Sequence, residues 1–185
     1  MFGAPIFMRI FKSSSELELW VKKGEQFERF KTYPICTFSG TLGPKTRQGD
    51  NQAPEGFYFI RPENLNPWST YHLSFNLGYP NIYDRANGRT GGALMIHGCC
   101  VSIGCYAMTD KYINEVYTLA QVAFEGEQTS FRVYIFPFDL YHEKLALYKD
   151  HPWYEFWLNL KQGYDFFQPE SGAARCFGEK WNVLL

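Results

Sequence analysis

The segment from Ile96 to Met108 contains the residue types that nucleophilic catalysis needs, at short spacing. It reads Ile-His-Gly-Cys-Cys-Val-Ser-Ile-Gly-Cys-Tyr-Ala-Met. Cysteine attacks as a thiolate, and a neighbouring imidazole can take its proton. We expect a strand to run into His97 and a loop of small residues to follow it. Cys105 is therefore a candidate nucleophile, and His97 is its candidate base.

The residues around Cys105 also suit the stabilisation of a tetrahedral intermediate. Gly104 permits a tight turn, so backbone N–H groups there could converge on one spot and form an oxyanion hole. The start of a helix near Thr109 would favour the thiolate, and we expect the pKa of Cys105 to lie below the roughly 8.5 of free cysteine. The structural alternatives are a buried cysteine that behaves as a small apolar residue and a histidine held at a strand end.

The other cysteines indicate neither a metal site nor a disulfide-rich scaffold. Cys99 and Cys100 could join His97 and Cys105 around a metal, but the paired spacing of structural zinc ligands is absent. We expect no metal and no cofactor. Cys36 and Cys176 are interpreted as core or surface thiols. In an oxidising compartment a pair among the cysteines could bridge, and the sequence leaves open which.

Hydrophobic patterning predicts a mainly β chain with two helices to position this segment. An apolar stripe at three-to-four spacing predicts a helix near 109–124, with Thr109 or Asp110 as its N-cap. Asp150, His151 and Pro152 open a second helix near 151–166. Residues 38–54 are rich in glycine, proline and polar side chains and predict a long loop, and the tail after Pro169 is glycine-rich and polar. The expected strands are 5–11, 16–21, 27–33, 57–60, 71–77, 92–97 and 131–136.

Composition excludes several classes of protein. The chain has 185 residues and a formal net charge of −1, which argues against a nucleic-acid binder. Its 17 phenylalanines, 13 tyrosines and 5 tryptophans rule out intrinsic disorder. No apolar run is long enough for a membrane span, and the first ten residues do not form a signal peptide as they stand. We expect one domain over residues 1–185.

A set of motifs along almost the whole chain resembles the catalytic domain of L,D-transpeptidases, also called the YkuD-type domain. His97-Gly98 and Ser102-Ile103-Gly104-Cys105 resemble the two halves of the family signature. The match is closer to the branch often called YafK-like. The further matching runs are Phe11-Lys12, Tyr33-Pro34-Ile35-Cys36, Ser39 to Lys45, Arg47 to Asp50, Pro54 to Tyr58, Leu65-Asn66-Pro67, Tyr83-Asp84-Arg85, Gly88 to Gly91 and Pro152 to Trp157.

The resemblance implies a fold and a role for each matching residue. The expected fold is a β-sandwich of mixed sheets with about two flanking helices. Cys105 would be acylated and His97 would be its base, with the Gly98 carbonyl orienting the far ring nitrogen. The N–H groups of Gly104, Cys105 and Tyr106 would form the oxyanion hole, and Ser102 would hold the loop by hydrogen bonds.

The chain departs from the general family pattern at three points. His97 and Cys105 are only eight positions apart, and Ile103 stands where a second histidine is usual; the YafK-like branch shares both features. Ala107 replaces the usual arginine or asparagine two positions after the cysteine. This replacement removes a polar group from the acyl-donor pocket, so we expect different donor contacts.

The family substrate is peptidoglycan, and the resemblance implies a periplasmic location in bacteria, with any signal peptide outside this sequence. The thiolate would attack the carbonyl of the third stem residue, commonly meso-diaminopimelate, and form a thioester. Water would then release a lipoprotein held through its lysine, the outcome associated with the YafK-like branch. The alternatives are a transpeptidase that makes 3–3 cross-links or attaches protein, and a non-catalytic module that binds the wall.

Several residues outside the signature are weaker candidates. Arg47, Arg85 and Arg89 could each grip a substrate carboxylate, and the alternative is a solvated or loop-pinning arginine. Trp68, Tyr71 and Tyr79 could pack on sugar or peptide, although the aromatic content favours a place in the core.

Overall fold

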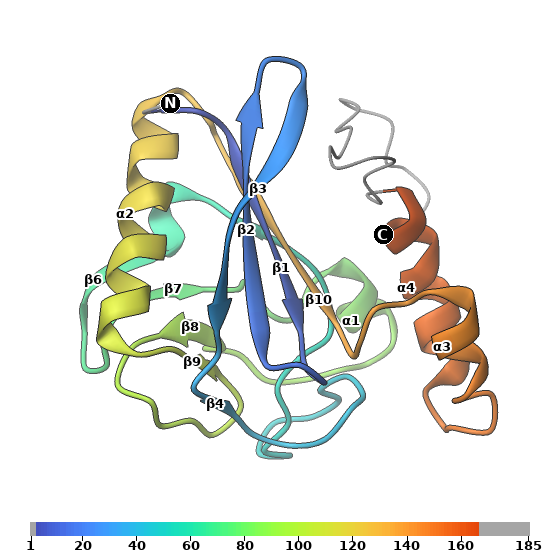
Figure 1. Ribbon diagram of the computed structural model, residues 1–185. Coiled ribbons are helices and arrows are strands. Elements are labelled where there is room, and N and C mark those ends of the chain that lie inside the picture. Colours follow the sequence, from blue (N-terminus) through green and yellow to red (C-terminus); the bar gives the residue numbers. More distant parts are fainter. Residues whose placement is uncertain (1–2, 167–185) are drawn as a thin grey trace.

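Two five-stranded β-sheets make up most of the computed structural model, which describes residues 3–166 (Figure 1). In spatial order, the strands of the first sheet are β3 (Gln26–Pro34), β2 (Glu16–Lys23), β1 (Ile6–Phe11), β10 (Phe131–Phe136) and β5 (Gly56–Ile60). Those of the second sheet are β4 (Thr37–Phe38), β9 (Tyr106–Ala107), β8 (Met95–His97), β7 (His72–Asn76) and β6 (Leu65–Ser69). Both sheets are mixed, because β1 with β10 and β8 with β9 are parallel pairs.

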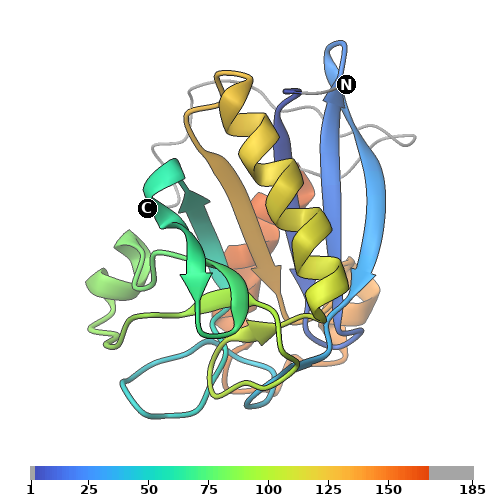
Figure 2. The ribbon, with the colours of Figure 1, turned by 90° about the vertical axis from the view of Figure 1, so that its left-hand side faces the viewer.

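Two long helices flank the sheets, and three shorter helical turns lie in the connections. The long helices are α2 (Asp110–Glu125) and α4 (Tyr154–Phe166). The short ones are the 3-10 turn η1 (Pro62–Asn64), α1 (Ile82–Ala86) and α3 (His142–Ala146). Figures 1 and 2 show α2 lying along one face of the first sheet, and Figure 1 shows α3 and α4 on the opposite side.

The first sheet is buried on both faces, and the alternation along β1 shows why. Ile6, Met8 and Ile10 pack toward the second sheet and α2, where they join the larger apolar core. Phe7 and Phe11 point the other way, into an aromatic core closed by α4. All six residues of β1 are buried. The molecule therefore has three layers, with the first sheet in the middle.

The predicted fold class is confirmed, and the differences are local. The expected helices correspond to α2 and α4, although α4 begins at Tyr154, so Pro152 lies in the turn before it. The short strands β4, β6 and β9 and the short helices α1 and α3 were not predicted, because two to five residues carry too little periodicity. The polar tail after Pro169 lies outside the described residues.

Lys12 directly follows β1 and holds together the predicted long loop, which connects β4 of the second sheet to β5 of the first. Its ammonium donates hydrogen bonds to the carbonyls of Thr41, Gly43 and Ala53, at 3.1, 2.7 and 2.8 Å. It also forms an ion pair with Glu55 at 3.2 Å, and neither side chain is exposed to solvent. Burial lowers the pKa of Lys12, and the charge of Glu55 opposes that shift. Residues 39–55 are thus gathered around one cation.

Glu55 extends this network to the third layer. Its carboxylate accepts hydrogen bonds from the Gly43 N–H at 2.7 Å and from Trp157 Nε1 at 2.8 Å. Trp157 belongs to α4, so the pair of Lys12 and Glu55 links the central sheet, the loop and the helix. A buried charge needs this many partners, because transfer out of water is otherwise too costly.

The network predicts a large effect for the substitution Lys12→Met. It leaves Glu55 charged and buried without its cation, and it removes a donor from three carbonyls, of which those of Thr41 and Gly43 keep the hydrogen bonds from Gln52. We expect the free energy of unfolding to fall by about 3–5 kcal/mol, as for other broken buried pairs, measured by urea denaturation.

A matched control is Lys23→Met, which removes an exposed lysine paired with Glu28. That change should cost less than about 1 kcal/mol. A loss from Lys12→Met as small as that of the control would contradict the role given to the buried ammonium.

Candidate active site

Cys105 and His97 lie on two neighbouring parallel strands of the second sheet. Strand β8 ends at His97, and Cys105 directly precedes β9, whose residues pair with Ile96 and His97. The sulfur of Cys105 accepts a hydrogen bond from the Met95 N–H at 3.4 Å, which turns the side chain toward β8. Neighbouring strands are about 4.8 Å apart. The parallel register places Cys105 level with Met95, two residues before His97, so that the side chains of Cys105 and His97 lie on the same face of the strand pair.

The ring of His97 is oriented by its own neighbour in the chain. Its Nδ1 lies 2.7 Å from the carbonyl oxygen of Gly98. A carbonyl only accepts hydrogen bonds, so Nδ1 carries the proton and Nε2 is left with its lone pair. The ring of Tyr71 packs against the imidazole, with 4.8 Å between the ring centroids. Burial lowers the pKa of His97, and the Gly98 carbonyl opposes the shift, so the ring is neutral near pH 7.

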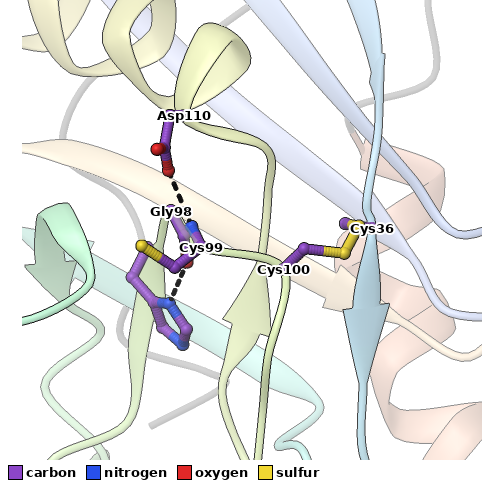
Figure 3. Close-up of a disulfide and its surroundings, with 6 residues drawn as sticks. Cys36, Gly98, Cys99, Cys100 and Asp110 are labelled. Carbon is purple, nitrogen blue, oxygen red and sulfur yellow. Dashed lines mark hydrogen bonds between the residues drawn. A yellow bond between two sulfur atoms is a disulfide. The ribbon is translucent and has the colours of Figure 1, made fainter.

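The loop between the two residues is pinned on several sides. Gly98 donates its N–H to the Tyr71 carbonyl at 3.0 Å, and a Cβ at Gly98 would lie 2.6 Å from a carboxylate oxygen of Asp110. The same oxygen accepts the N–H of Cys99 at 2.8 Å (Figure 3). This carboxylate stands at the start of α2, whose N-cap is Thr109 without a side-chain hydrogen bond. Asp110 therefore fastens the loop to the helix.

A disulfide between Cys36 and Cys100 holds the same loop from the other side (Figure 3). Cys36 lies in the two-residue link between β3 and β4, and its N–H donates to the Ala107 carbonyl at 2.9 Å. The interpretation of Cys36 as a free thiol is therefore wrong. The sequence pattern left the pairing open, because the two cysteines are 64 positions apart. Cys99 is free and exposed, and Cys176 lies outside the described residues.

The backbone around Gly104 has the conformation that the sequence suggested, with one unexpected partner. Gly104 has φ of +97°, which L residues with a side chain rarely adopt. Its N–H donates to the hydroxyl oxygen of Ser39 at 2.5 Å. Ser102 donates from its hydroxyl to the Cys105 carbonyl at 2.7 Å. Tyr106 lies in β9, between two paired strands. Three N–H groups were expected to form an oxyanion hole. That of Gly104 is bonded to Ser39 and Tyr106 lies within the sheet, whereas the N–H of Cys105 takes part in none of these contacts.

The electrostatic environment of Cys105 differs from the expectation. Burial raises the pKa of its thiol, while the hydrogen bond from Met95 and the charge of Lys45 act in the opposite direction. The predicted depression of this pKa is therefore wrong, because burial of the sulfur outweighs the contacts that favour the thiolate. The resting pair is a neutral thiol beside a neutral imidazole.

The three candidate arginines do not meet at Cys105. Arg89 is buried, pairs with Asp84 at 2.8 Å and stacks over the ring of Phe156 at 4.6 Å. It is therefore a structural, loop-pinning residue. Arg47 is exposed on the long loop. Arg85 is exposed on α1 and lines a pocket that Cys105 does not line.

The three aromatic candidates differ in their exposure to solvent. Tyr79 is buried, as expected for a core residue, and its hydroxyl donates to the Lys45 carbonyl at 3.2 Å. Trp68 is 91% exposed, so a place in the core is wrong for this residue. Tyr71 is partly exposed over His97.

Two contributors to the site were missed as individual residues, Ser39 and Lys45. Both lie in the run of residues 39–45 that carried the resemblance, but their spacing alone indicates no contact with Gly104 or Cys105. Lys45 is buried and pairs with Asp50, whose pKa is lowered to about 2; burial opposes this shift, and the hydrogen bond from Lys45 is the largest of the contacts that produce it. Within residues 3–166, no group of three metal-ligating side chains is found.

Comparison with known proteins gives a consistent family assignment. Residues 8–135 match the family model of the L,D-transpeptidase catalytic domain, called YkuD. The chain is 46% identical over 168 residues to YafK, a protein named as a candidate L,D-transpeptidase in Escherichia coli K12. That alignment covers 91% of this chain and 68% of YafK.

Solved structures support the fold at lower sequence identity. The helical cell shape determining protein Pgp2 of Campylobacter jejuni superposes with a TM-score of 0.59 and 20% identity, over 89% of this chain and 61% of that one. Bd1075 of Bdellovibrio bacteriovorus superposes with a TM-score of 0.52 and 20% identity, over 90% and 57%. The chain thus spans about three fifths of these solved chains. No helix within residues 3–166 is long and apolar enough to span a bilayer.

The raised pKa of Cys105 predicts how the free protein reacts with iodoacetamide. Only the thiolate reacts, so the alkylation rate of Cys105 should rise with pH and reach its midpoint above the roughly 8.5 of free cysteine. Fragment-ion mass spectrometry of the peptide that contains residues 90–111 separates Cys105 from the exposed Cys99, which serves as internal control. A midpoint for Cys105 below that value would indicate a preformed thiolate and contradict the neutral pair.

Proposed function

Because this chain belongs to the L,D-transpeptidase catalytic domain family, we propose that it is a cysteine acyl-enzyme acting on peptidoglycan stem peptides. Cys105 is the proposed nucleophile and His97 the proposed base. The observation that carries the proposal is the hydrogen bond from His97 Nδ1 to the Gly98 carbonyl. It leaves Nε2 as a proton acceptor on the strand beside Cys105.

The first half of the proposed reaction forms a thioester. The Cys105 sulfur attacks the carbonyl carbon of the third stem residue while its proton passes to Nε2 of His97. The carbonyl oxygen becomes an oxyanion, and the N–H of Cys105 is available to stabilise it. The C–N bond then breaks, and the leaving amine takes the proton from His97. The imidazole returns to its neutral form.

A neutral resting pair suits this sequence of proton transfers. Burial disfavours the charged forms of both groups, so the proton moves only when the attack on the carbonyl begins. Ser102 and Ser39 support this step as positioning residues. Their hydrogen bonds fix the Cys105 carbonyl and the Gly104 N–H on either side of the nucleophile.

The second half of the reaction decides the biological outcome. We propose that water, deprotonated by His97, attacks the carbonyl carbon of the thioester; the C–S bond breaks, the Cys105 sulfur takes the proton back from His97, and a carboxylate is released. The net result is hydrolysis of the bond between diaminopimelate and the lysine of a wall-linked lipoprotein. Support comes from the motifs shared with the YafK-like branch and from 46% identity to YafK itself. The proposed location is the bacterial periplasm, where this substrate occurs.

The direct test incubates the protein with sacculi that carry bound lipoprotein, beside the variant Cys105→Ala. We expect the unmodified chain to release lipoprotein, and the alanine variant to release none above background. The matched control is Cys99→Ala, which removes an exposed thiol in the same loop and should retain release. Protein gels and muropeptide masses are the readouts.

Each other outcome of that experiment contradicts a different part of the proposal. New cross-linked dimers without release would indicate transpeptidation. Turnover by Cys105→Ala would remove Cys105 as the nucleophile. No change in either product would favour a module that binds the wall without catalysis.

The lowered pKa of His97 predicts the acid limb of the pH profile. The base must be neutral, and burial favours the neutral ring, so activity should persist below pH 6.5 and fall only as pH drops through the lowered pKa. We expect the acid midpoint of kcat/KM below the roughly 6.5 of free histidine. A midpoint above that value would indicate that His97 is not the titrating base.

A further inference from the structure

A pocket of about 340 Å³ opens between β5, α1 and α4, and it is separate from the candidate active site. No residue between 86 and 155 lines it, so neither Cys105 nor His97 contributes. Two of the elements around it, α1 and α4, lie near each other on the right of Figure 1. Its volume is in the range of pockets that bind small molecules or short peptides.

Aromatic side chains form the walls of this pocket. Phe57 and Phe59 come from β5, and Phe156 comes from α4. Tyr83 of α1 packs against Phe156 with 5.7 Å between ring centroids, which closes one side. Phe59 is 47% exposed even though it lies in a strand of the central sheet. Such walls suit the aliphatic part of a ligand.

The acidic groups of the lining are already neutralised by partners behind the pocket. Glu55 is paired with Lys12, and Asp84 is paired with Arg89. Asp84 also accepts hydrogen bonds from the Tyr58 hydroxyl at 3.2 Å and the Asn81 N–H at 3.0 Å. These two carboxylates therefore leave little negative potential for a ligand to meet.

The other charged side chains that line the pocket are exposed, and they lie on or next to short helical turns. Arg61 is the N-cap of η1, and its N–H donates to the Asn64 side chain at 2.8 Å. Arg85 lies on α1, and its guanidinium donates to the Pro80 carbonyl, which orients it. Glu63 is the one exposed carboxylate among the lining residues. Two guanidinium forks beside one carboxylate match a ligand with carboxylates and an amine.

We propose that this pocket binds the carboxylate-bearing end of a peptide, with Arg61 and Arg85 on the carboxylates and Glu63 on an amine. The source of that peptide rests on the proposed function. In a wall enzyme it is a second stem peptide, held while Cys105 acts on the first. The pocket would thus hold the polymer rather than take part in the chemistry.

The test is a titration of Cys105→Ala protein, labelled at its isoleucine and leucine methyl groups, with a free stem tripeptide ending in meso-diaminopimelate. Ile82 and Leu160 line the pocket and report on it. Leu94 lies 3.3 Å from where a Cβ of Gly104 would be, so it reports on the candidate active site. We expect saturable shifts at Ile82 and Leu160.

Arg61→Ala combined with Arg85→Ala should weaken the Ile82 response at least about tenfold in Kd. The Leu94 response should not change. The matched control, Lys23→Ala with Lys149→Ala, removes two exposed positive charges outside the pocket and should leave the Ile82 response unchanged. The same tripeptide with amidated carboxylates should produce no Ile82 shift, a comparison that needs no variant.

The remaining outcomes distinguish this inference from the proposed function. A response at Leu94 without one at Ile82 would overturn the pocket proposal and leave the proposed function standing. A response at Ile82 alone would support the pocket and count against stem-peptide binding beside Cys105. An equal Ile82 response to inorganic phosphate would overturn the assignment to peptide carboxylates. Absence of any response to the tripeptide would overturn it as well.

Discussion

The buried ammonium of Lys12 is the contact on which the geometry around Cys105 depends. It gathers three carbonyls of the long loop and the carboxylate of Glu55 at the end of the central strand β1. Gln52 donates to two of the same carbonyls, and the Ser39 carbonyl accepts the Ala53 N–H. Ser39 in turn accepts the N–H of Gly104. An ion pair in the core is therefore connected through hydrogen bonds and the loop backbone to the residue before Cys105, the proposed nucleophile.

Burial also sets the chemical state of the reactive pair. The thiol of Cys105 is half-buried and the imidazole of His97 is buried, and burial disfavours the charged form of each. The contacts around the two residues fix their orientation instead. The Gly98 carbonyl sets the tautomer of His97, Gly104 allows the turn before Cys105, and Asp110 and the disulfide hold the loop between them. If Cys105 acts as proposed, its neutral thiol reacts more slowly with unrelated electrophiles than a thiolate would.

Sequence patterns predicted the features that repeat or that form signatures, and they missed those that depend on distant contacts. The alternation of Leu17 and Leu19 and the stripe along α2 each span enough residues to be read directly. The positions of Cys105, His97 and Gly104 followed from a short local motif. The bond from Gly104 to Ser39 and the bridge from Cys100 to Cys36 join residues more than 60 positions apart. The raised pKa of Cys105 follows from burial, which spacing does not reveal.

Because β1 pairs with β10 in parallel, the first sheet is completed only after the strands near the N-terminus have been made. Met8 pairs with Val133, so the centre of the first sheet joins residues about 125 positions apart. The hairpins β1–β2 and β2–β3 can form as soon as residues 6–34 are made, but one edge of β1 then stays open. An open apolar strand edge is prone to pairing with other chains. During synthesis the chain therefore passes through a long interval in which β1 must wait for β10, a topology that slows folding and exposes it to aggregation.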